Sequence, residues 1–503
     1  MEWWALVLGA GWALATVPAA WAVAGMCGLV DKPDARRKIH PRPVPLAGGP
    51  ALAAALLAAA GVLWFLEHPQ VVAWVRGAEG KVAAGIAAAC AILLGVGIAD
   101  DYGWVRGRHK LLAQLLAVGL VLLSGVVVRR VSLFGFEWEL HFLAYPLTAF
   151  WLVGAINAYN LLDGMDGLVG VVSLTACLAA AAIGWLAGDG VLTLAGLALA
   201  GAVLVFLCYN WPPATVFLGD SGSMMLGLLL GLLALRAAML PRSGVVLAPA
   251  TALVFVPVLD TAAAILRRSL TGRSLYAADR GHIHHVLLRR GFSVVQVLGI
   301  LGGLAGLGAA AAVASKAWNH DLPALATVTA AIVFLAATGW FGRAELELVL
   351  NQLRHSLLAW YQPRPRQPRQ LEIHLQGTAD WRELWQRLTD FADTANLQSI
   401  RLDVSLPAMH EEYHARWDRP LGPAEPHDLW VTTIPLTLGQ IPIGRLEIRA
   451  IRDHVPVSDK LLQISRFVEE IEKSAASMVR CRTVPADGSS EPAAMDATIS
   501  PLS

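Results

Sequence analysis

Acidic, amide and basic side chains gather in four polar stretches that interrupt long apolar runs. These stretches are IADDYGWVRGRHKLLAQ (98–114), NAYNLLDGMDGL (157–168), YNWPPATVFLGDSGSMMLG (209–227) and PVLDTAAAILRRSLTGRSLYAADRGHIHH (257–285). Carboxylates beside hydrocarbon are costly and therefore mark functional sites. Carboxylates bind Mg²⁺ together with substrate phosphates, while Lys, Arg and backbone N–H groups in glycine-rich turns bind phosphate oxygens. The chemistry that suits these stretches is metal-assisted phosphoryl transfer.

The apolar runs between these stretches have the length of membrane-spanning helices. Eleven runs are near the ~20 residues that cross a bilayer; they are 3–26, 46–66, 82–99, 111–128, 143–156, 169–187, 190–209, 218–239, 245–266, 295–315 and 323–341. Only 15% of the 503 residues are charged, well below the roughly 25% of soluble domains. The fold class predicted is an all-α polytopic membrane protein with about eleven transmembrane helices and a small C-terminal cytoplasmic α/β domain.

Lys and Arg residues in the connections predict the orientation. The loops at 27–45, 100–110 and 267–294 hold 14 of them, and the alternating loops hold 7. Because cytoplasmic loops carry the excess of positive charge, we expect the N-terminus outside and the C-terminus inside. All four polar stretches then face the cytoplasm, which favours a catalytic face over a transport pathway through the midplane. The net charge of +1 gives no indication of nucleic-acid binding, and the cysteines lack metal-site or disulfide spacing.

The composition changes after Phe341, which suggests the domain boundaries. We expect a membrane domain over 1–342, an amphipathic helix and Pro/Arg linker over 343–370, a soluble domain over 371–480 and a disordered tail over 481–503. Within the soluble domain, LEIHLQ, SIRLDVSL, LWVTTIPL and PIGRLEIRA alternate like strands, and 380–396 and SDKLLQISRFVEEIEKS have helical spacing.

Several of these motifs carry a family resemblance. DDYGWVRGRHKLLAQ, NAYNLLDGMDGL, FLGDSGS, DRGHIHH and GLVDKPDARRKIHPRPVPLAGG resemble the signature loops of the polyprenyl-phosphate N-acetylhexosamine-1-phosphate transferases, in the order found there. The resemblance implies transfer of a sugar 1-phosphate from a UDP-sugar to a lipid phosphate such as undecaprenyl phosphate, with release of UMP. It also implies a Mg²⁺ cofactor, for which Mn²⁺ is a possible substitute, and a multi-pass location in the cytoplasmic (inner) membrane. It leaves a homodimer open.

The resemblance assigns roles position by position. Asp220 matches the metal ligand, and Asp100 and Asp101 match an acidic pair that deprotonates the lipid phosphate or assists the metal. The catalytic group implied is Asp100, Asp101, Asp163 and Lys110. The substrate-binding group implied is Lys38, His40, Asn160, Gly164, Asp166, Asn210, Phe217, Arg268, His282, His284 and His285. Asn160, Gly164 and Asp166 lie near the uridine in this assignment, and Phe217 stacks on uracil.

The last motif bears on the donor. The related phospho-MurNAc-pentapeptide translocases have three consecutive histidines where this chain has DRGHIHH. The form here, with Arg268 and Arg273 upstream, is similar to that of the N-acetylglucosamine-type enzymes, so we expect an N-acetylhexosamine 1-phosphate to be transferred.

Several single motifs also fit a zinc site or a protease. HIHH could bind zinc, but no cysteine or fourth ligand lies nearby in sequence. HEEYH at 410–414 fits the HExxH zinc-protease pattern, although Pro407 and Pro420 confine any helix there to about three turns. FLGD is similar to part of an intramembrane aspartyl protease motif, but Leu218 precedes Gly219 and Asn210 follows Tyr209. Each isolated Asp could also be a helix cap or turn residue.

Overall fold

The chain forms two separate compact units. Unit 1 is Met1–Leu346 and unit 2 is Glu347–Ser503. The computed structural model describes residues 2–31, 42–77, 79–134, 136–240, 247–271, 281–343, 345–347, 349–350, 353, 369–376, 381–395, 397–406, 411–419, 429–438, 441–451, 461–462 and 464–473.

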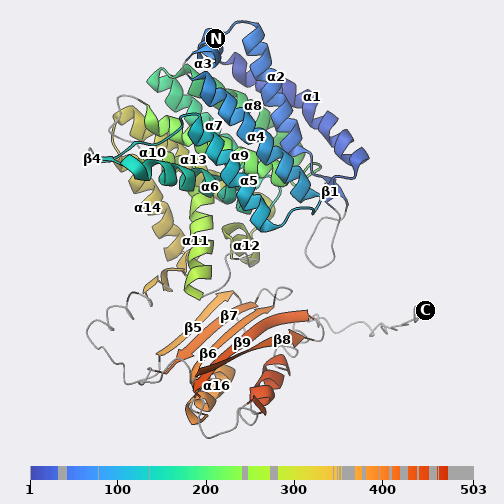
Figure 1. Ribbon diagram of the computed structural model, residues 1–503, viewed down its shortest axis with the longest axis vertical. Coiled ribbons are helices and arrows are strands. Elements are labelled where there is room, and N and C mark those ends of the chain that lie inside the picture. The colour runs from blue at the N-terminus through green and yellow to red at the C-terminus, as the bar shows by residue number, and fades with distance from the viewer. Residues whose placement is uncertain are drawn as a thin grey trace, which may run out of the picture. The chain divides into compact units, whose positions relative to one another are not determined.

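Unit 1 is a bundle of apolar helices that run side by side (Figure 1). Its helices are α1 (Trp4–Cys27), α2 (Gly48–Phe65), α3 (Pro69–Arg76), α4 (Gly80–Asp101), α5 (Gly107–Leu123), α6 (Ala144–Leu162), α7 (Leu168–Ala187), α8 (Gly190–Asn210), α9 (Gly219–Met239), α10 (Leu247–Leu253), α11 (Phe255–Thr271), α12 (Ile283–Arg289), α13 (Val294–Trp318) and α14 (Leu322–Ala337). Two short hairpins pair β1 (Val30–Asp31) with β2 (Val44–Pro45) and β3 (Arg130–Leu133) with β4 (Phe136–Glu139).

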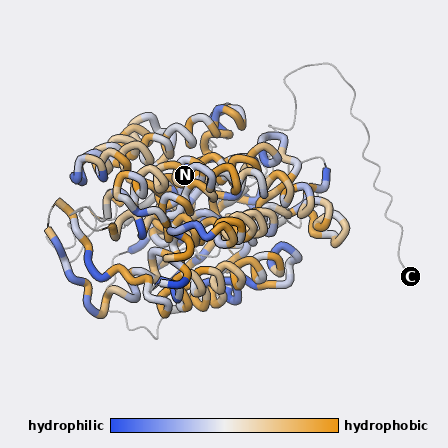
Figure 2. The backbone as a smooth tube through the Cα atoms, turned by 90° about the horizontal axis from the view of Figure 1, so that it is seen from above, coloured by the Kyte–Doolittle hydropathy of each residue, from blue (hydrophilic) through white to orange (hydrophobic). Residues whose placement is uncertain are grey.

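Eight helices in the described part of the chain are long and apolar enough to cross a membrane. They are α1, α2, α4, α6 with the short turn before it, α7, α8, α9 and α13. Figure 2 shows hydrophobic residues along most of the helical segments. The prediction of a multi-pass, helical membrane protein is therefore confirmed, while the count of eleven spans and their orientation stay predictions.

Three expected spans differ in the structure. The run 245–266 is divided at Val254 into α10 and α11, and Pro257 near the start of α11 lacks the N–H that would continue one helix across the break. The runs 111–128 and 323–341 correspond to helices of 17 and 16 residues. In addition, α6 continues to Leu162, so Asn157 and Asn160 lie in its last turns rather than in a loop.

Unit 2 contains a five-stranded antiparallel sheet. Its strands are β5 (Arg369–Gln376), β6 (Leu397–Leu406), β7 (Glu411–Asp418), β8 (Leu429–Leu438) and β9 (Ile441–Ile451), in the order β5-β7-β6-β9-β8. The helix α16 (Arg382–Thr394) and the helical residues 464–473 pack on one face (Figure 1). The four predicted strands are present, and β7 is a fifth that the sequence pattern did not indicate.

Unit 2 has a hydrophobic core that is separate from the core of unit 1. Trp381, Trp385, Tyr413 and Trp417 are fully or almost fully buried, with Leu402 and Ile448 from neighbouring strands in the same cluster. We therefore expect a chain ended at Pro363 to keep unit 1 folded, because that cut removes a separate core and leaves the helical one intact.

The measurement is thermal unfolding and size-exclusion chromatography of the shortened and full chains in detergent. A melting transition within about 2 °C of the full chain is expected for unit 1. Aggregation of the shortened chain, with the isolated unit 2 well folded, would show that the helical unit depends on the sheet.

Candidate active site

The candidate site is built at one end of unit 1, where four helix termini meet. Asp100 and Asp101 end α4, Lys110 lies in the first turn of α5, Asn160 lies in the last turn of α6, and Asp220 lies in the first turn of α9. Residues from three separate polar stretches are therefore in direct contact. The polar side chains sit at the ends of these helices because the intervening segments are apolar and pack in the bundle.

Lys110 connects two of the carboxylates. Its Nζ lies 2.9 Å from Asp100 Oδ2 and 2.7 Å from Asp220 Oδ2. The three side chains are 16%, 19% and 32% exposed, in that order, so the ion pairs are only partly screened by solvent. Removing the lysine would leave two carboxylates close together without their cation, which is strongly destabilising in a buried setting.

The second oxygen of Asp220 is held from α6. Asn160 Nδ2 donates to Asp220 Oδ1 over 2.6 Å and to Ser223 Oγ over 2.9 Å. The orientation of the Asp220 carboxylate is thus fixed from two sides, by an ammonium group and by an amide. Each carboxylate oxygen has further lone pairs, so both can still accept a cation.

The Asp101 carboxylate caps the N-terminus of α9. Its Oδ1 accepts from the backbone N–H of Asp220 at 2.8 Å, and its Oδ2 lies 3.5 Å from the backbone N of Ser221. Gly219 has φ +74°, and a Cβ there would lie 2.7 Å from Asp101 Oδ2, so glycine is required for this approach. The charge of Asp101 is unfavourable at the end of its own helix, but the N-terminus of α9 stabilises it.

Asp163 follows α6 and faces the same group of carboxylates. Burial, together with the negative charges of Asp220, Asp101 and Asp166, raises the pKa of Asp163 to about 8. At neutral pH, Asp163 is therefore mainly protonated.

Asp166 and Asn210 join two loops. Asp166 Oδ2 accepts from Ala214 N at 2.9 Å. Asn210 is buried; its Oδ1 accepts from Gly167 N at 2.9 Å, and its Nδ2 donates to Val216 O at 2.8 Å. Both amide groups of Asn210 thus bond to the backbone, which makes it a positioning residue for the loops that carry Asp163 and Phe217.

Phe217 lies where the loop before α9 meets the chain before α2. Its backbone N–H donates to Pro45 O at 2.9 Å, and its carbonyl accepts from Gly48 N at 3.0 Å. The loop therefore has a fixed backbone, and the partly buried Phe217 ring extends from a rigid base.

The histidine cluster lies beside the 157–168 stretch. A Cβ at Gly164 would be 2.8 Å from His284 Nε2, so the two positions are in contact. His284 is 1% exposed; burial first, and then the charges of His285, His282 and Arg289, hold the pKa of its imidazole well below the usual value. The rings of His284 and His285 are 4.2 Å apart between centroids.

Asp260 fixes the start of this cluster. Its Oδ2 lies 2.9 Å from His282 Nδ1, and its Oδ1 accepts from Ile283 N at 2.8 Å. Arg268, on the same helix as Asp260, is mostly buried. Lys38 and His40, which were expected near the phosphates, lie outside the described residues.

Sequence reasoning did not assign several residues that the structure brings to the site. These are Ser223, Asp260 and the pair Gln114–Asn157, in which Asn157 Nδ2 donates to Gln114 Oε1 at 2.8 Å. The available signal was a polar residue inside an apolar helix, as in PVLDTAAA around Asp260. Such a residue is costly there unless another polar group meets it.

The HExxH interpretation is wrong for the described part of the motif. Residues Glu411–Asp418 form strand β7, so the pattern does not lie on a helix that could present two side chains one turn apart. Among the described residues, no group of three or more His, Cys, Asp or Glu side chains could by itself hold a metal ion.

Comparisons with known proteins identify the family of this chain. The model of a family described as glycosyl transferase family 4 matches residues 83–238. A probable undecaprenyl-phosphate N-acetylglucosaminyl 1-phosphate transferase of Bacillus subtilis is 31% identical over 271 residues, which cover 53% of this chain and 71% of the relative.

The chain belongs to glycosyl transferase family 4.

Further relatives include an N-acetylglucosaminyl 1-phosphate transferase and a phospho-N-acetylmuramoyl-pentapeptide-transferase. An undecaprenyl-phosphate alpha-N-acetylglucosaminyl 1-phosphate transferase of Escherichia coli K12 is 30% identical over 286 residues, covering 54% of this chain and 72% of the relative. A phospho-N-acetylmuramoyl-pentapeptide-transferase of Moorella thermoacetica is 35% identical over 160 residues, covering 32% of this chain and 49% of the relative. The resemblance to the sugar-1-phosphate transferases is confirmed.

The cap on α9 predicts unequal effects of the two neighbouring acids. Asp101→Ala should lower the free energy of unfolding by about 1–2 kcal/mol, because it removes the acceptor for the first N–H groups of α9. Asp100→Ala is the matched variant, since Asp100 bonds to Lys110, which keeps Asp220 as a partner. Thermal unfolding in detergent compares them, and an equal or larger loss for Asp100→Ala would contradict the capping role.

The raised pKa of Asp163 predicts a pH effect on stability without divalent cations. Between about pH 4 and pH 8, the folded state holds a proton on Asp163 that the unfolded chain has released, so stability should fall as the pH rises through this window. Asp163→Asn cannot ionise and should show a smaller decline. Parallel melting curves of the two proteins from pH 5 to pH 8.5 in EDTA test this, and identical slopes would rule it out.

Proposed function

We propose that this chain transfers N-acetylhexosamine 1-phosphate, with GlcNAc 1-phosphate as the first choice, from its UDP derivative to undecaprenyl phosphate. The relatives from B. subtilis and E. coli are named for this activity. The observation that carries the proposal is the contact of Asp220 with Lys110 and Asn160, which joins an acid, a cation and an amide at one end of the bundle. The reaction would begin the synthesis of a lipid-linked cell-envelope glycan.

The reaction exchanges one phosphoanhydride bond for another. An ionised oxygen of the lipid phosphate attacks the sugar-bearing phosphorus of the UDP-sugar and forms a new P–O bond. The bond between that phosphorus and the bridging oxygen breaks, and the electron pair leaves with UMP. The products are the lipid diphosphate sugar and UMP, with no oxidation or reduction.

The donor set at Asp220 suits Mg²⁺. This ion usually takes one or two protein carboxylates and completes its shell with water and substrate phosphate oxygens. Burial first, and then the charges of Asp220, Asp101 and Asp166, raise the pKa of Asp163, so this group of acids carries negative charge that a cation would offset. Asp220 would hold the ion, with Asp163 the next candidate ligand. The bound ion would neutralise the donor diphosphate and charge developing on departing UMP.

The remaining side chains would position the substrates. Lys110 would neutralise a phosphate oxygen beside the ion that Asp220 holds, and Asn160 would keep that carboxylate in place. The neutral His284 can donate or accept a hydrogen bond to a phosphate without repelling a cation. Asp166 and Asn210 would hold the loops that present Gly164 and Phe217 to the uridine.

The positive-inside distribution supports an active site on the cytoplasmic face of the inner membrane, with the N-terminus outside and the C-terminus inside. The donor nucleotide is water-soluble and cytosolic, whereas the acceptor is held in the bilayer. A site at the helix ends would be accessible to the soluble donor and to the membrane-bound acceptor. Mn²⁺ would substitute for Mg²⁺ because both bind oxygen ligands in octahedral geometry.

The test measures UMP release and the lipid product with purified protein, undecaprenyl phosphate, Mg²⁺ and either UDP-GlcNAc or UDP-MurNAc-pentapeptide. UDP-GlcNAc should be the better donor, and Asp220→Asn should lower kcat by about 10²–10³-fold, as for loss of one preorganised electrostatic contact. Added Mg²⁺ should not restore the rate.

Asp393→Asn is the matched control, because Asp393 is exposed in unit 2 and should keep full activity. A preference for the pentapeptide donor would reverse the branch assignment. Full Mg²⁺-dependent turnover by Asp220→Asn would remove Asp220 from metal binding.

A further inference from the structure

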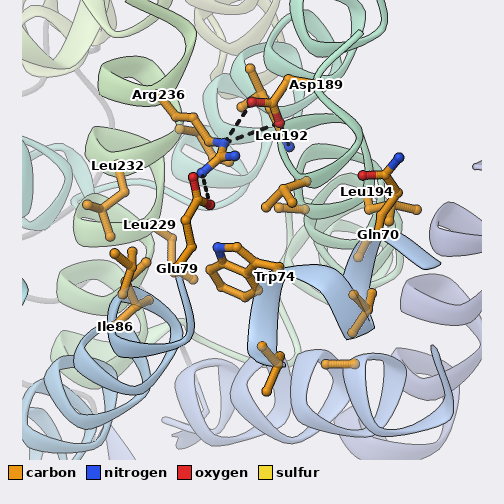
Figure 3. A pocket seen from close by; sticks show the side chains of 18 of the residues that line it. Gln70, Trp74, Glu79, Ile86, Asp189, Leu192, Leu194, Leu229, Leu232 and Arg236 are labelled. Atoms are coloured by element: carbon orange, nitrogen blue, oxygen red, sulfur yellow. Dashed lines mark hydrogen bonds and ion pairs between the residues drawn. The ribbon is translucent and has the colours of Figure 1, made fainter. Parts of the chain in front are cut away.

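A large apolar cavity lies in unit 1 at the helix ends opposite the candidate site. It has a volume of about 820 Å³ and lies between α2, α3, α4, α8 and α9 (Figure 3). The site uses the end of α4 and the start of α9, whereas the cavity uses the start of α4 and the end of α9. Arg236 lies 16 residues after Asp220 on α9. This spacing corresponds to ~24 Å along the helix axis.

The cavity wall is made mainly of Leu, Val, Ile, Ala, Met and Trp side chains, with one polar corner and with Gln70 apart from that corner (Figure 3). Its charged and amide lining residues are Gln70, Glu79, Asp189 and Arg236. Val75 and Ala195 also line it and are exposed at the surface of the unit, so the cavity opens outward. In a membrane-spanning bundle, such an opening at the level of the apolar helices faces lipid. Its volume is in the range of binding sites for drug-sized ligands.

The polar corner is an ion cluster with one carboxylate more than its cation can neutralise. Arg236 Nε lies 3.1 Å from Asp189 Oδ2, and Arg236 Nη1 lies 3.0 Å from Glu79 Oε2. Asp189 also caps α8 by accepting from Leu192 N at 2.7 Å. The three side chains converge beside Trp74 (Figure 3). Their net charge of −1 would repel an anionic headgroup and attract a cationic one.

Trp74 adds a hydrogen-bond donor to the same corner. It comes from α3, a short helix without buried residues that forms one wall of the cavity. The indole Nε1 is buried and has no hydrogen-bond partner among the described residues. A buried indole N–H ordinarily has an acceptor, so an oxygen atom supplied by a ligand would meet this need.

We propose that this cavity binds one bilayer glycerophospholipid whose headgroup carries an ammonium group, as in phosphatidylethanolamine. The acyl chain fills the apolar part, and the Trp74 N–H donates to a phosphate or ester oxygen. Arg236 faces the phosphate, while Glu79 and Asp189 accept from the ammonium. The site lies in the leaflet opposite the proposed catalytic face, and it does not depend on the transferase proposal.

The experiment is native mass spectrometry of the full chain after reconstitution in vesicles of equimolar phosphatidylethanolamine and phosphatidylglycerol and gentle extraction. Wild type should retain one phospholipid per chain, enriched in phosphatidylethanolamine. Ala195→Phe should abolish retention, because the ring occupies the cavity. Leu204→Phe is the matched control, since Leu204 is exposed on the same helix and outside the cavity lining.

Two further variants separate the headgroup from the cavity. Glu79→Gln should lower the ratio of phosphatidylethanolamine to phosphatidylglycerol by about fivefold, as for one partly exposed ion pair. Trp74→Phe should lower total retention, because it removes the N–H donor while keeping an aromatic ring at this position. If Ala195→Phe does not fold, Ala60→Phe fills the cavity from α2.

Three results would overturn the proposal. Retention by a folded cavity-filling variant equal to wild type would show that the lipid binds elsewhere. Equal or greater retention of phosphatidylglycerol by wild type would remove the ammonium-binding role of the cluster. Displacement of the retained phospholipid by added undecaprenyl phosphate would assign the cavity to the acceptor lipid.

Discussion

The geometry of the candidate site depends on the bond between the Asp101 carboxylate and the first N–H groups of α9. That bond joins the end of one membrane helix to the start of another, and it places Asp220 on the far side of the same turn. It requires close backbone approach, which the glycines supply: a Cβ at Gly97 would lie 2.2 Å from Ser221 Cα. With α4 and α9 fixed in this way, Lys110 and Asn160 can reach both oxygens of Asp220 from two further helices.

The same arrangement concentrates negative charge. In the described contacts, Lys110 is shared by Asp100 and Asp220, while Asp101 bonds to neutral backbone groups and Asp163 is driven toward its protonated form. Under the proposed function, this charge would favour a divalent cation, because each added positive charge relieves several repulsions at once. Without the cation, the site would repel a nucleoside diphosphate. The proposal therefore implies that the donor enters together with its metal rather than as the free anion.

The apolar runs and the alternating strands could be predicted from the sequence because each follows from local periodicity. The convergence of Asp100, Lys110, Asn160 and Asp220 followed from placing the polar stretches on one membrane face. The capping by Asp101 and the engagement of both Asn210 amide groups could not be predicted, since they are tertiary contacts between segments far apart in sequence. Strand β7 was missed because its charged residues, and the buried His414 between them, obscure the alternation of the buried Tyr413, Ala415 and Trp417. The break at Val254 was missed because the apolar run 245–266 was treated as one helix despite Pro257, which marks a helix start.

The helix α9 contributes a charge of opposite sign to each of the two polar clusters, although both clusters hold more acids than bases. Its charged residues are Asp220 near the N-terminus and Arg236 near the C-terminus, the arrangement that the helix dipole favours. The positive N-terminus attracts Asp101 and permits the crowded acids of the candidate site. The negative C-terminus is met by Arg236, which pairs with Asp189 and Glu79. One buried helix thus contributes the acid of one polar cluster and the cation of the other, with ~24 Å between them along its axis.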